Sequence, residues 1–146
     1  MKITICGSVA FQDEALFLKE KLEKLGHEVK LWPLELKDEK GQLISTREYY
    51  QIRRIANENE KWVWDRKAEA ILEHFNKIAW ADAILVLNYE KNNIKGYIGG
   101  NTLMEMGLAF FLKKKIYLLF QIPELPYKEE ILGLKPIIIN GDLNKI

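Results

Sequence analysis

Glu105 is the residue in this sequence whose surroundings most call for a chemical explanation. It is the only charged residue between Leu103 and Leu112, a segment that is apolar around nearly the whole circumference of a helix and should therefore be buried. A buried carboxylate is costly unless it is paired or hydrogen-bonded, and such groups cluster at functional sites. The alternative is a capping box, because Thr102-x-x-Glu105 has the spacing at which a glutamate reaches back to the N-cap backbone. Both interpretations stay open.

A glycine-rich loop precedes this helix and could hold an anion. Backbone N–H groups at a helix N-terminus are unpaired, and the helix dipole adds to their attraction for phosphate. The alternative is that Gly99-Gly100 only forms a tight turn. The loop matches neither the dinucleotide fingerprint nor a Walker A loop, which argues against a dehydrogenase or an ATPase. The candidate substrate- or phosphate-binding residues here are Gly99, Gly100, Asn101 and Thr102.

Short apolar runs and helical patterns alternate along the chain and must position these residues. The run Lys2–Cys6 predicts a buried strand, the spacing of apolar residues from Phe11 to Leu25 predicts a helix, and Glu28–Trp32 predicts a second strand. Residues 35–45 are polar and rich in turn formers, so we expect a loop there. The segments that follow predict a helical stretch at 46–79 with a break near 57–59, a strand at 83–87, a helix at 102–112, a strand at 115–120, a short helix at 128–132 and an edge strand at 136–139.

This alternation predicts an α/β fold in one domain spanning residues 1–146. Strands joined through helices are parallel, and helices then cover both faces of the sheet. We expect the flavodoxin-like (Rossmann-like) three-layer sandwich with a five-stranded parallel sheet, whose ligands bind beyond the carboxyl ends of the strands. Two loops lie there, Gly7-Ser8 after the first strand and residues 88–100 after the third. Asn88, at the end of the third strand, is a candidate for hydrogen bonding to a base or sugar.

Composition excludes several classes of partner. The 146 residues carry 22 Lys and Arg against 21 Asp and Glu, so no strong global field recruits nucleic acid or an anionic membrane. No apolar run approaches the roughly 20 residues that span a bilayer, and no signal peptide is visible, so we expect a cytoplasmic protein. Cys6 is the single cysteine, which excludes an intramolecular disulfide; a small buried residue is favoured over a reactive thiol.

Two stretches of the chain resemble nucleoside 2-deoxyribosyltransferases and the related 2′-deoxynucleoside 5′-phosphate N-hydrolases. They are ADAILVLN…GYIGGNTLMEMGLAFFLKKKIYLL, from Ala81 to Leu119, and KITICGS at residues 2–8. These enzymes have a flavodoxin-like fold and a Gly-(aromatic or Met)-Glu-(Leu or Met)-Gly motif that opens a helix. Met104-Glu105-Met106-Gly107 fits the last four positions of that motif.

The resemblance implies that Glu105 is a nucleophile. Its carboxylate would attack the anomeric carbon of a nucleoside or its 5′-monophosphate, and water or a second base would resolve the glycosyl ester, as in retaining glycosidases. Gly7, Ser8, Gly99, Gly100 and Asn101 would contact phosphate or sugar. The resemblance calls for no metal and no cofactor, and it implies a homodimer or higher homo-oligomer, for which the helical segment 46–79 is the candidate surface.

The chain departs from the family in three places. The family's usual Asp, eight residues before Asp82, is replaced by His74, which could serve as an acid at its ordinary pKa of about 6.5 or be a core histidine on an apolar helix face. The tyrosine of the first strand is absent, since Thr4 and Ile5 occupy that region, and so is the basic residue that the hydrolases carry in the first loop, where Ala10 and Phe11 lie here. These departures keep a non-catalytic nucleotide-binding or sensing module open as a second hypothesis. A flavin protein is a weaker third, because the first loop lacks a hydroxyl-rich phosphate grip.

Overall fold

A five-stranded parallel sheet forms the centre of the molecule. The computed structural model describes residues 1–146 and places the strands in the order β2-β1-β5-β6-β7. Every neighbouring pair in this sheet is parallel. The order is that of a flavodoxin-like sheet, so the predicted fold class is confirmed. The strands are β1 (Lys2–Gly7), β2 (Glu28–Lys30), β5 (Ala83–Leu87), β6 (Lys115–Leu118) and β7 (Ile137–Ile138).

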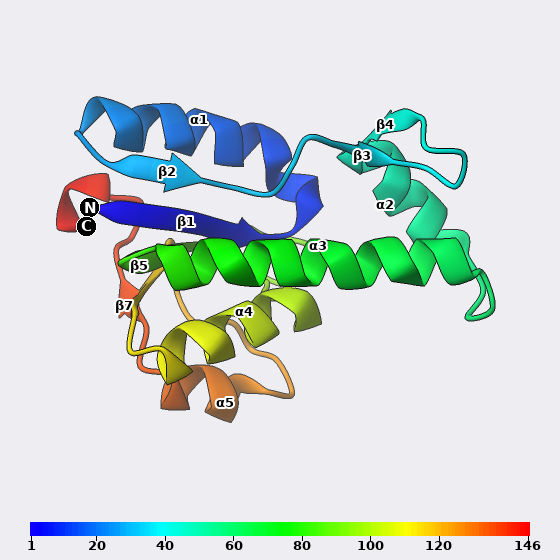
Figure 1. Cartoon of the computed structure of the whole chain (residues 1–146). Coiled ribbons are helices and arrows are strands. Elements are labelled where there is room, and N and C mark those ends of the chain that lie inside the picture. The colour runs from blue at the N-terminus through cyan, green and yellow to red at the C-terminus, as the bar shows by residue number, and fades with distance from the viewer.

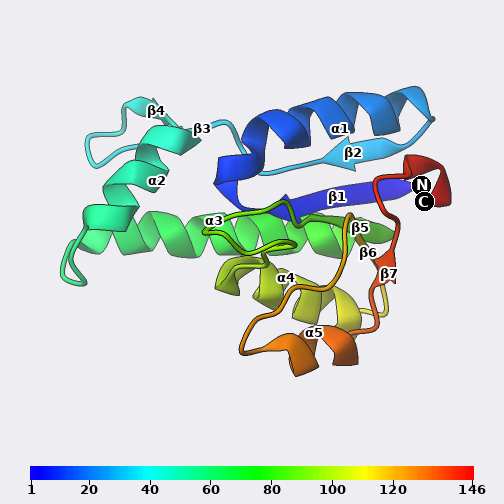
Figure 2. The same cartoon turned by 180° about the vertical axis from the view of Figure 1, so that it is seen from behind.

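Helices cover both faces of this sheet (Figures 1 and 2). α1 (Gln12–Lys24) packs on one face, and α3 (Lys61–Trp80), α4 (Gly100–Phe111) and α5 (Lys128–Gly133) pack on the other. Residues of a strand alternate between the faces. Ile3 and Ile5 of β1 therefore join the core beneath α1, whereas Cys6 joins the core beneath α3 and α4.

The region between β2 and α3 differs from the loop predicted at residues 35–45. Residues 35–45 contain a small antiparallel hairpin, β3 (Glu35–Lys37) and β4 (Leu43–Ser45), so the expectation of a loop was wrong there. The Asp38 carboxylate closes the turn by accepting from the backbone N–H groups of Lys40 and Gln42, both at 2.9 Å. Ser45 then begins α2 (Thr46–Ile55), because its hydroxyl accepts from the Glu48 backbone N–H at 3.0 Å. The break predicted near residues 57–59 separates α2 from α3.

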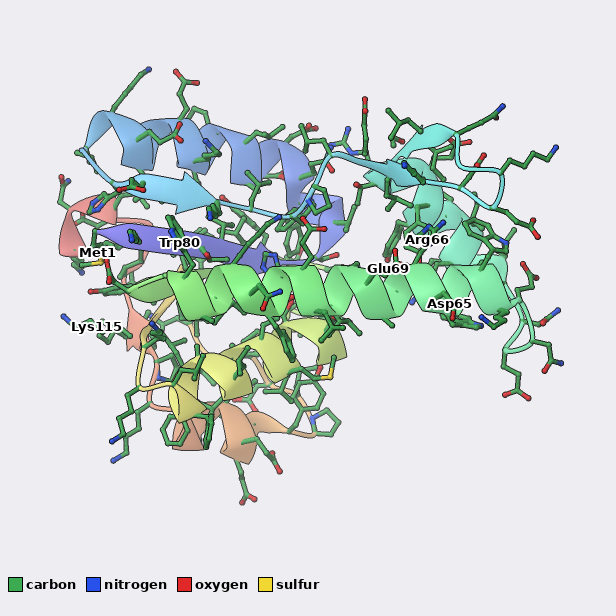
Figure 3. All side chains as sticks on the ribbon, viewed as in Figure 1. Met1, Asp65, Arg66, Glu69, Trp80 and Lys115 are labelled. Carbon is green, nitrogen blue, oxygen red and sulfur yellow. The ribbon has the colours of Figure 1, made fainter.

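α3 is longer than the sheet that it covers. Its 20 residues rise about 30 Å, whereas the six residues of β1 extend about 20 Å. The first turns of α3 therefore project beyond the carboxyl ends of the strands, where α2 and the β3–β4 hairpin lie against it (Figure 1). The Tyr49 hydroxyl of α2 donates to the Val63 carbonyl of α3. Arg66, which is labelled beside α3 in Figure 3, donates from Nε to the Lys37 carbonyl at 2.8 Å. α2 and the hairpin thus form an extra wall above the sheet edge.

Other boundaries shift by one or two residues from the prediction. α4 begins at Gly100, two residues before the predicted start, while β2 and β6 end two residues early, at Lys30 and Leu118. None of the helices combines the length and apolar character needed to cross a membrane. The homodimer surface on 46–79 and the cytoplasmic location stay predictions; on that segment Ile55 and Leu72 are exposed apolar residues.

Candidate active site

A narrow cleft lies beyond the carboxyl end of β1, between α2, α3 and α4. Its volume is about 90 Å³. Because β1 and β5 are adjacent and the chain leaves them toward opposite edges of the sheet, this is the topological switch point of the fold. The lining residues come from five segments of the chain: Gly7, Val9, Trp32, Pro33, Leu36, Thr46, Tyr49, Tyr50, Arg53, Lys67, Ala70, Ile71, His74, Asn101 and Glu105.

Glu105 is buried at the bottom of this cleft, with 4% of its surface exposed. Its Oε1 accepts a hydrogen bond from Asn101 Nδ2 at 2.8 Å, one helical turn earlier, and its Oε2 has no partner. Burial raises the pKa of this carboxyl to about 8, although Cys6, Lys67 and Asn101 each favour the ionised form. The site therefore presents a carboxyl group with one unused oxygen and a pKa close to neutrality.

The capping box that Thr102 and Glu105 suggested is not formed. The N-cap of α4 is Gly99, no side chain caps the helix, and Thr102 lies inside its first turn. Glu105 reaches Asn101 instead of the backbone. This alternative for Glu105 was wrong, because the helix begins earlier than the motif assumed.

His74 of α3 faces Glu105 from across the helix interface. Its Nε2 lies 3.9 Å from Glu105 Oε1 and 3.5 Å from Cys6 Sγ, and its Nδ1 has no hydrogen-bond partner. Burial, with help from the Lys77 cation, lowers the pKa of His74 to about 4. The imidazole is thus neutral near pH 7, which disfavours the proton-donor role that its ordinary pKa would allow. Burial also raises the pKa of the Cys6 thiol well above its usual value, as expected for a structural cysteine.

Two cations enter the cleft without a carboxylate partner. Lys67 Nζ donates to Asn101 Oδ1 at 3.2 Å, and burial, together with the Arg53 charge, lowers its pKa to about 8. Arg53 has a buried Nε without a partner, and its guanidinium carbon lies 5.1 Å from the centre of the Tyr50 ring. Sequence reasoning missed both residues, because nothing in the charged segment 46–79 separates an inward-facing cation from a solvated one.

A third cation, Lys91, connects the first loop to α2. Its Nζ donates to Ser8 Oγ at 2.9 Å and to the Tyr50 hydroxyl at 3.2 Å. Burial alone would raise the pKa of Tyr50, but the hydrogen bond from Lys91 and the charges of Lys91, Arg54 and Arg53 outweigh it and lower the pKa. Ser8 is therefore tied to the rim of the cleft through Lys91.

The structure brings some of the predicted site residues together and separates others. The cleft is lined by four of them, Glu105, His74, Gly7 and Asn101. Its lining does not include Gly99, Gly100 or Thr102. Asn88 lies elsewhere, and its amide is fully used: Nδ2 donates to the carbonyls of Phe120 and Gln121 at 3.1 and 2.9 Å, and Oδ1 accepts from the Phe120 N–H at 2.8 Å. In this structure Asn88 links the ends of β5 and β6.

A larger hollow of about 670 Å³ lies on the Asn88 side of the loop, lined by residues 88–96 and 120–124. The charged residues that line it, Glu90, Lys95 and Glu124, are all exposed, and its one tyrosine, Tyr89, is partly buried. Perturbed, buried ionisable groups cluster at functional sites, and the smaller cleft holds three of them, Glu105, His74 and Lys67. The smaller cleft around Glu105 is therefore the better candidate for chemistry.

Comparison with known proteins bears on the fold. No protein-family model and no curated protein sequence matches this chain. A 2-deoxyribosyltransferase from Bacillus psychrosaccharolyticus matches in structure with a TM-score of 0.50 at 16% identity, over 82% of this chain and 72% of that one. The chain has the 2-deoxyribosyltransferase fold. A CMP N-glycosidase from Clostridium botulinum also matches, with a TM-score of 0.49 at 17% identity, over 96% of this chain and 90% of that one. At these identities the likeness to the 2-deoxyribosyltransferase is one of fold, and at that level it confirms the resemblance seen in the sequence.

Proposed function

We propose that this protein breaks the N-glycosidic bond of a nucleoside or nucleotide, with Glu105 as the nucleophile. The observation that carries the proposal is the carboxyl group of Glu105, buried in the switch-point cleft with Oε2 unpartnered. The shared fold supports it, because the matched Bacillus protein is a 2-deoxyribosyltransferase. A buried structural carboxylate would instead be expected to have both oxygens satisfied.

The reaction would proceed by double displacement. Ionised Glu105 attacks the anomeric carbon, the bond from that carbon to the base nitrogen breaks, and the base leaves with the bonding electrons and takes a proton from solvent water. Water, or the N–H nitrogen of a second base, then attacks the anomeric carbon of the glycosyl ester, gives up its proton to solvent and frees the Glu105 carboxylate. Lys67 favours the ionised form of Glu105, and Asn101 holds Oε1, so that Oε2 is directed to the sugar.

A nucleoside 5′-monophosphate is the substrate form that best suits the cations of the cleft. Arg53 and Lys67 have no carboxylate partner, and Lys91 lies beside Ser8 at the rim. A phosphate would satisfy these charges, since a guanidinium forms strong charge-assisted hydrogen bonds with phosphate oxygens. The 90 Å³ cleft is smaller than the roughly 300 Å³ of a typical ligand pocket. We therefore expect α2 and the hairpin to move outward when the substrate binds.

The test is chromatography of nucleoside 5′-monophosphates and nucleosides, in ribo and deoxyribo forms, after incubation with the protein. We expect the wild type to release free base and Glu105→Gln to release less than about a hundredth as much. Glu124→Gln is the matched control, because Glu124 is an exposed carboxylate that lines the larger hollow, and it should be fully active.

Two outcomes would contradict the proposal. Undiminished activity of Glu105→Gln would remove the nucleophile from its role. Tight nucleotide binding by the wild type without base release, with free bases also offered as acceptors, would identify a binding module instead.

A further inference from the structure

Three buried side chains of different chemistry meet beneath the cleft. Cys6 comes from the end of β1, His74 from α3 and Glu105 from α4, and all three are buried. One donor atom from each, a sulfur, a ring nitrogen and a carboxylate oxygen, lies within 4.8 Å of the others. His74 Nε2 is 3.5 Å from Cys6 Sγ and 3.9 Å from Glu105 Oε1. The reaction proposed above uses neither the Cys6 thiol nor this convergence.

The spacing suits a tetrahedral metal ion. With a metal–sulfur bond of about 2.3 Å and a metal–nitrogen bond of about 2.0 Å, tetrahedral zinc holds its sulfur and nitrogen ligands about 3.5 Å apart. Cys6 Sγ and His74 Nε2 already have that separation. Nitrogen and oxygen ligands of zinc would be about 3.3 Å apart, so the His74–Glu105 distance would need to shorten by only about half an ångström. Cys6 Sγ lies within 4.8 Å of a Glu105 oxygen, and zinc would hold these two atoms about 3.6 Å apart, so Glu105 would also need to move toward Cys6 by up to about an ångström.

The donor set and its surroundings select the kind of ion. Thiolate and imidazole ligands suit zinc and disfavour magnesium and calcium, which prefer oxygen. A thiolate and a carboxylate together neutralise a divalent cation, so the occupied site carries no net charge in its buried position. Glu105 Oε2 has no hydrogen-bond partner, and the Asn101 amide holds Oε1 as an outer-shell group would.

We propose that Cys6, His74 and Glu105 bind a zinc ion, with the fourth ligand position open to the cleft. His74 and Glu105 line the cleft, so the ion would enter from that side. The bound ion would neutralise the Glu105 carboxylate that the proposed reaction needs as its nucleophile, which makes zinc an inhibitor.

Titration calorimetry with zinc chloride on the metal-free protein tests the site. We expect one ion per chain for the wild type and a loss of affinity beyond roughly 100-fold for Cys6→Ala and for His74→Gln, because each removes a ligand. His27→Gln is the matched control: His27 is the other histidine of the chain, and its Nδ1 lies 3.1 Å from the terminal amine, where an adventitious ion could bind. This variant should bind zinc as the wild type does.

Cobalt substitution tests the same site without any variant. Co²⁺ bound to the wild type should show a thiolate-to-metal charge-transfer band and tetrahedral d–d absorption. Added zinc should displace the cobalt ion, so that both absorptions disappear. Absence of binding by the wild type, cobalt spectra without the thiolate band, or unchanged zinc affinity in Cys6→Ala would each overturn the proposal.

The zinc site and the proposed function are tested by independent measurements. Calorimetry and cobalt spectra report binding even if the protein releases no base. If the wild type releases base in the presence of a chelator, added zinc should reduce that rate in proportion to the measured occupancy. Full activity at saturating zinc would show that Glu105 is not both a zinc ligand and the nucleophile. Base release itself would still be established by that result.

Discussion

His74 Nε2 lies 3.9 Å from Glu105 Oε1 where α3 and α4 pack together, and both side chains are about 95% buried. Burial shifts the pKa values of the two groups in opposite directions. It raises the pKa of Glu105 to about 8 and lowers the pKa of His74 to about 4, so both groups are mainly uncharged near pH 7. The dependence of activity and stability on pH should report this arrangement.

Base release should increase with pH up to about 8. The proposed nucleophile is the ionised carboxylate, so kcat/KM should rise about tenfold per pH unit below the Glu105 pKa and then level off. In Lys67→Met the midpoint should move to higher pH, because the Lys67 charge lowers the pKa of Glu105. Lys61→Met, also on α3 but 87% exposed, should leave the midpoint in place. A rate independent of pH from 6 to 9 would contradict the assigned role.

The free energy of unfolding should fall between pH 6.5 and 8. Glu105 has a pKa near 4.5 in the unfolded chain and about 8 in the folded one, so the stability that it contributes is complete below pH 4.5 and is lost as the pH rises toward 8. His74 acts in the opposite sense, because its pKa falls from 6.5 to about 4 on folding, and its contribution is already complete above pH 6.5. Only Glu105 of this pair changes in that window, and the expected loss is roughly 2 kcal/mol.

Glu105→Gln provides the comparison for this stability change. The glutamine is neutral at every pH, so denaturant unfolding of this variant should lack the decrease that the wild type shows between pH 6.5 and 8. Parallel curves for the two proteins would mean that Glu105 is ionised in the folded state at neutral pH.

Arg53 should distinguish nucleotides from nucleosides. Arg53→Met removes a cleft cation that has no carboxylate partner. We expect kcat/KM for a 5′-monophosphate to fall roughly 10- to 100-fold, because that is the loss expected when one charge-assisted hydrogen bond to the phosphate is removed. The matching nucleoside should be affected far less. Arg47→Met, on the same helix but facing solvent in a pair with Asp13, is the control and should change neither rate. Equal losses for both substrates would show that Arg53 does not contact the phosphate.

Gly96 should be among the least replaceable residues of the chain. Its φ of 72° lies in the left-handed region, and a Cβ there would come within 2.4 Å of the Gln121 carbonyl oxygen. Gly26 has a φ of 92° with no atom within 4 Å of a Cβ, so Gly26→Ala measures the cost of the backbone conformation alone. Gly96→Ala should be more destabilising than Gly26→Ala by about 1–3 kcal/mol in urea unfolding, as for other overpacked sites. Equal losses would mean that the loop after β5 moves away from Gln121 without cost.

The sequence by itself determined the sheet, most of its helices and the burial of Glu105 in an apolar helix. Strand and helix patterns are local, since they depend on the period with which apolar residues recur, and a parallel α/β order then restricts the topology to a few choices. Glu105 was visible for the same reason, as one charge in an apolar helix. The capping box was also a local pattern, but α4 begins at Gly100, after a loop that is held by a distant contact, the hydrogen bond from the Tyr127 hydroxyl to the Ile98 carbonyl.

Only the tertiary structure decided what surrounds Glu105. Cys6 and His74 are 68 positions apart in the chain, and Lys67 is 34 positions from Asn101. No short-range sequence pattern therefore predicts either contact. The hairpin and α2 pack onto the end of α3 and turn Arg53 inward, whereas the sequence shows it only as one of several charges in a polar segment. Burial then shifts the pKa values of Glu105, His74 and Lys67, because the loss of water around a charged group depends on packing from several elements at once.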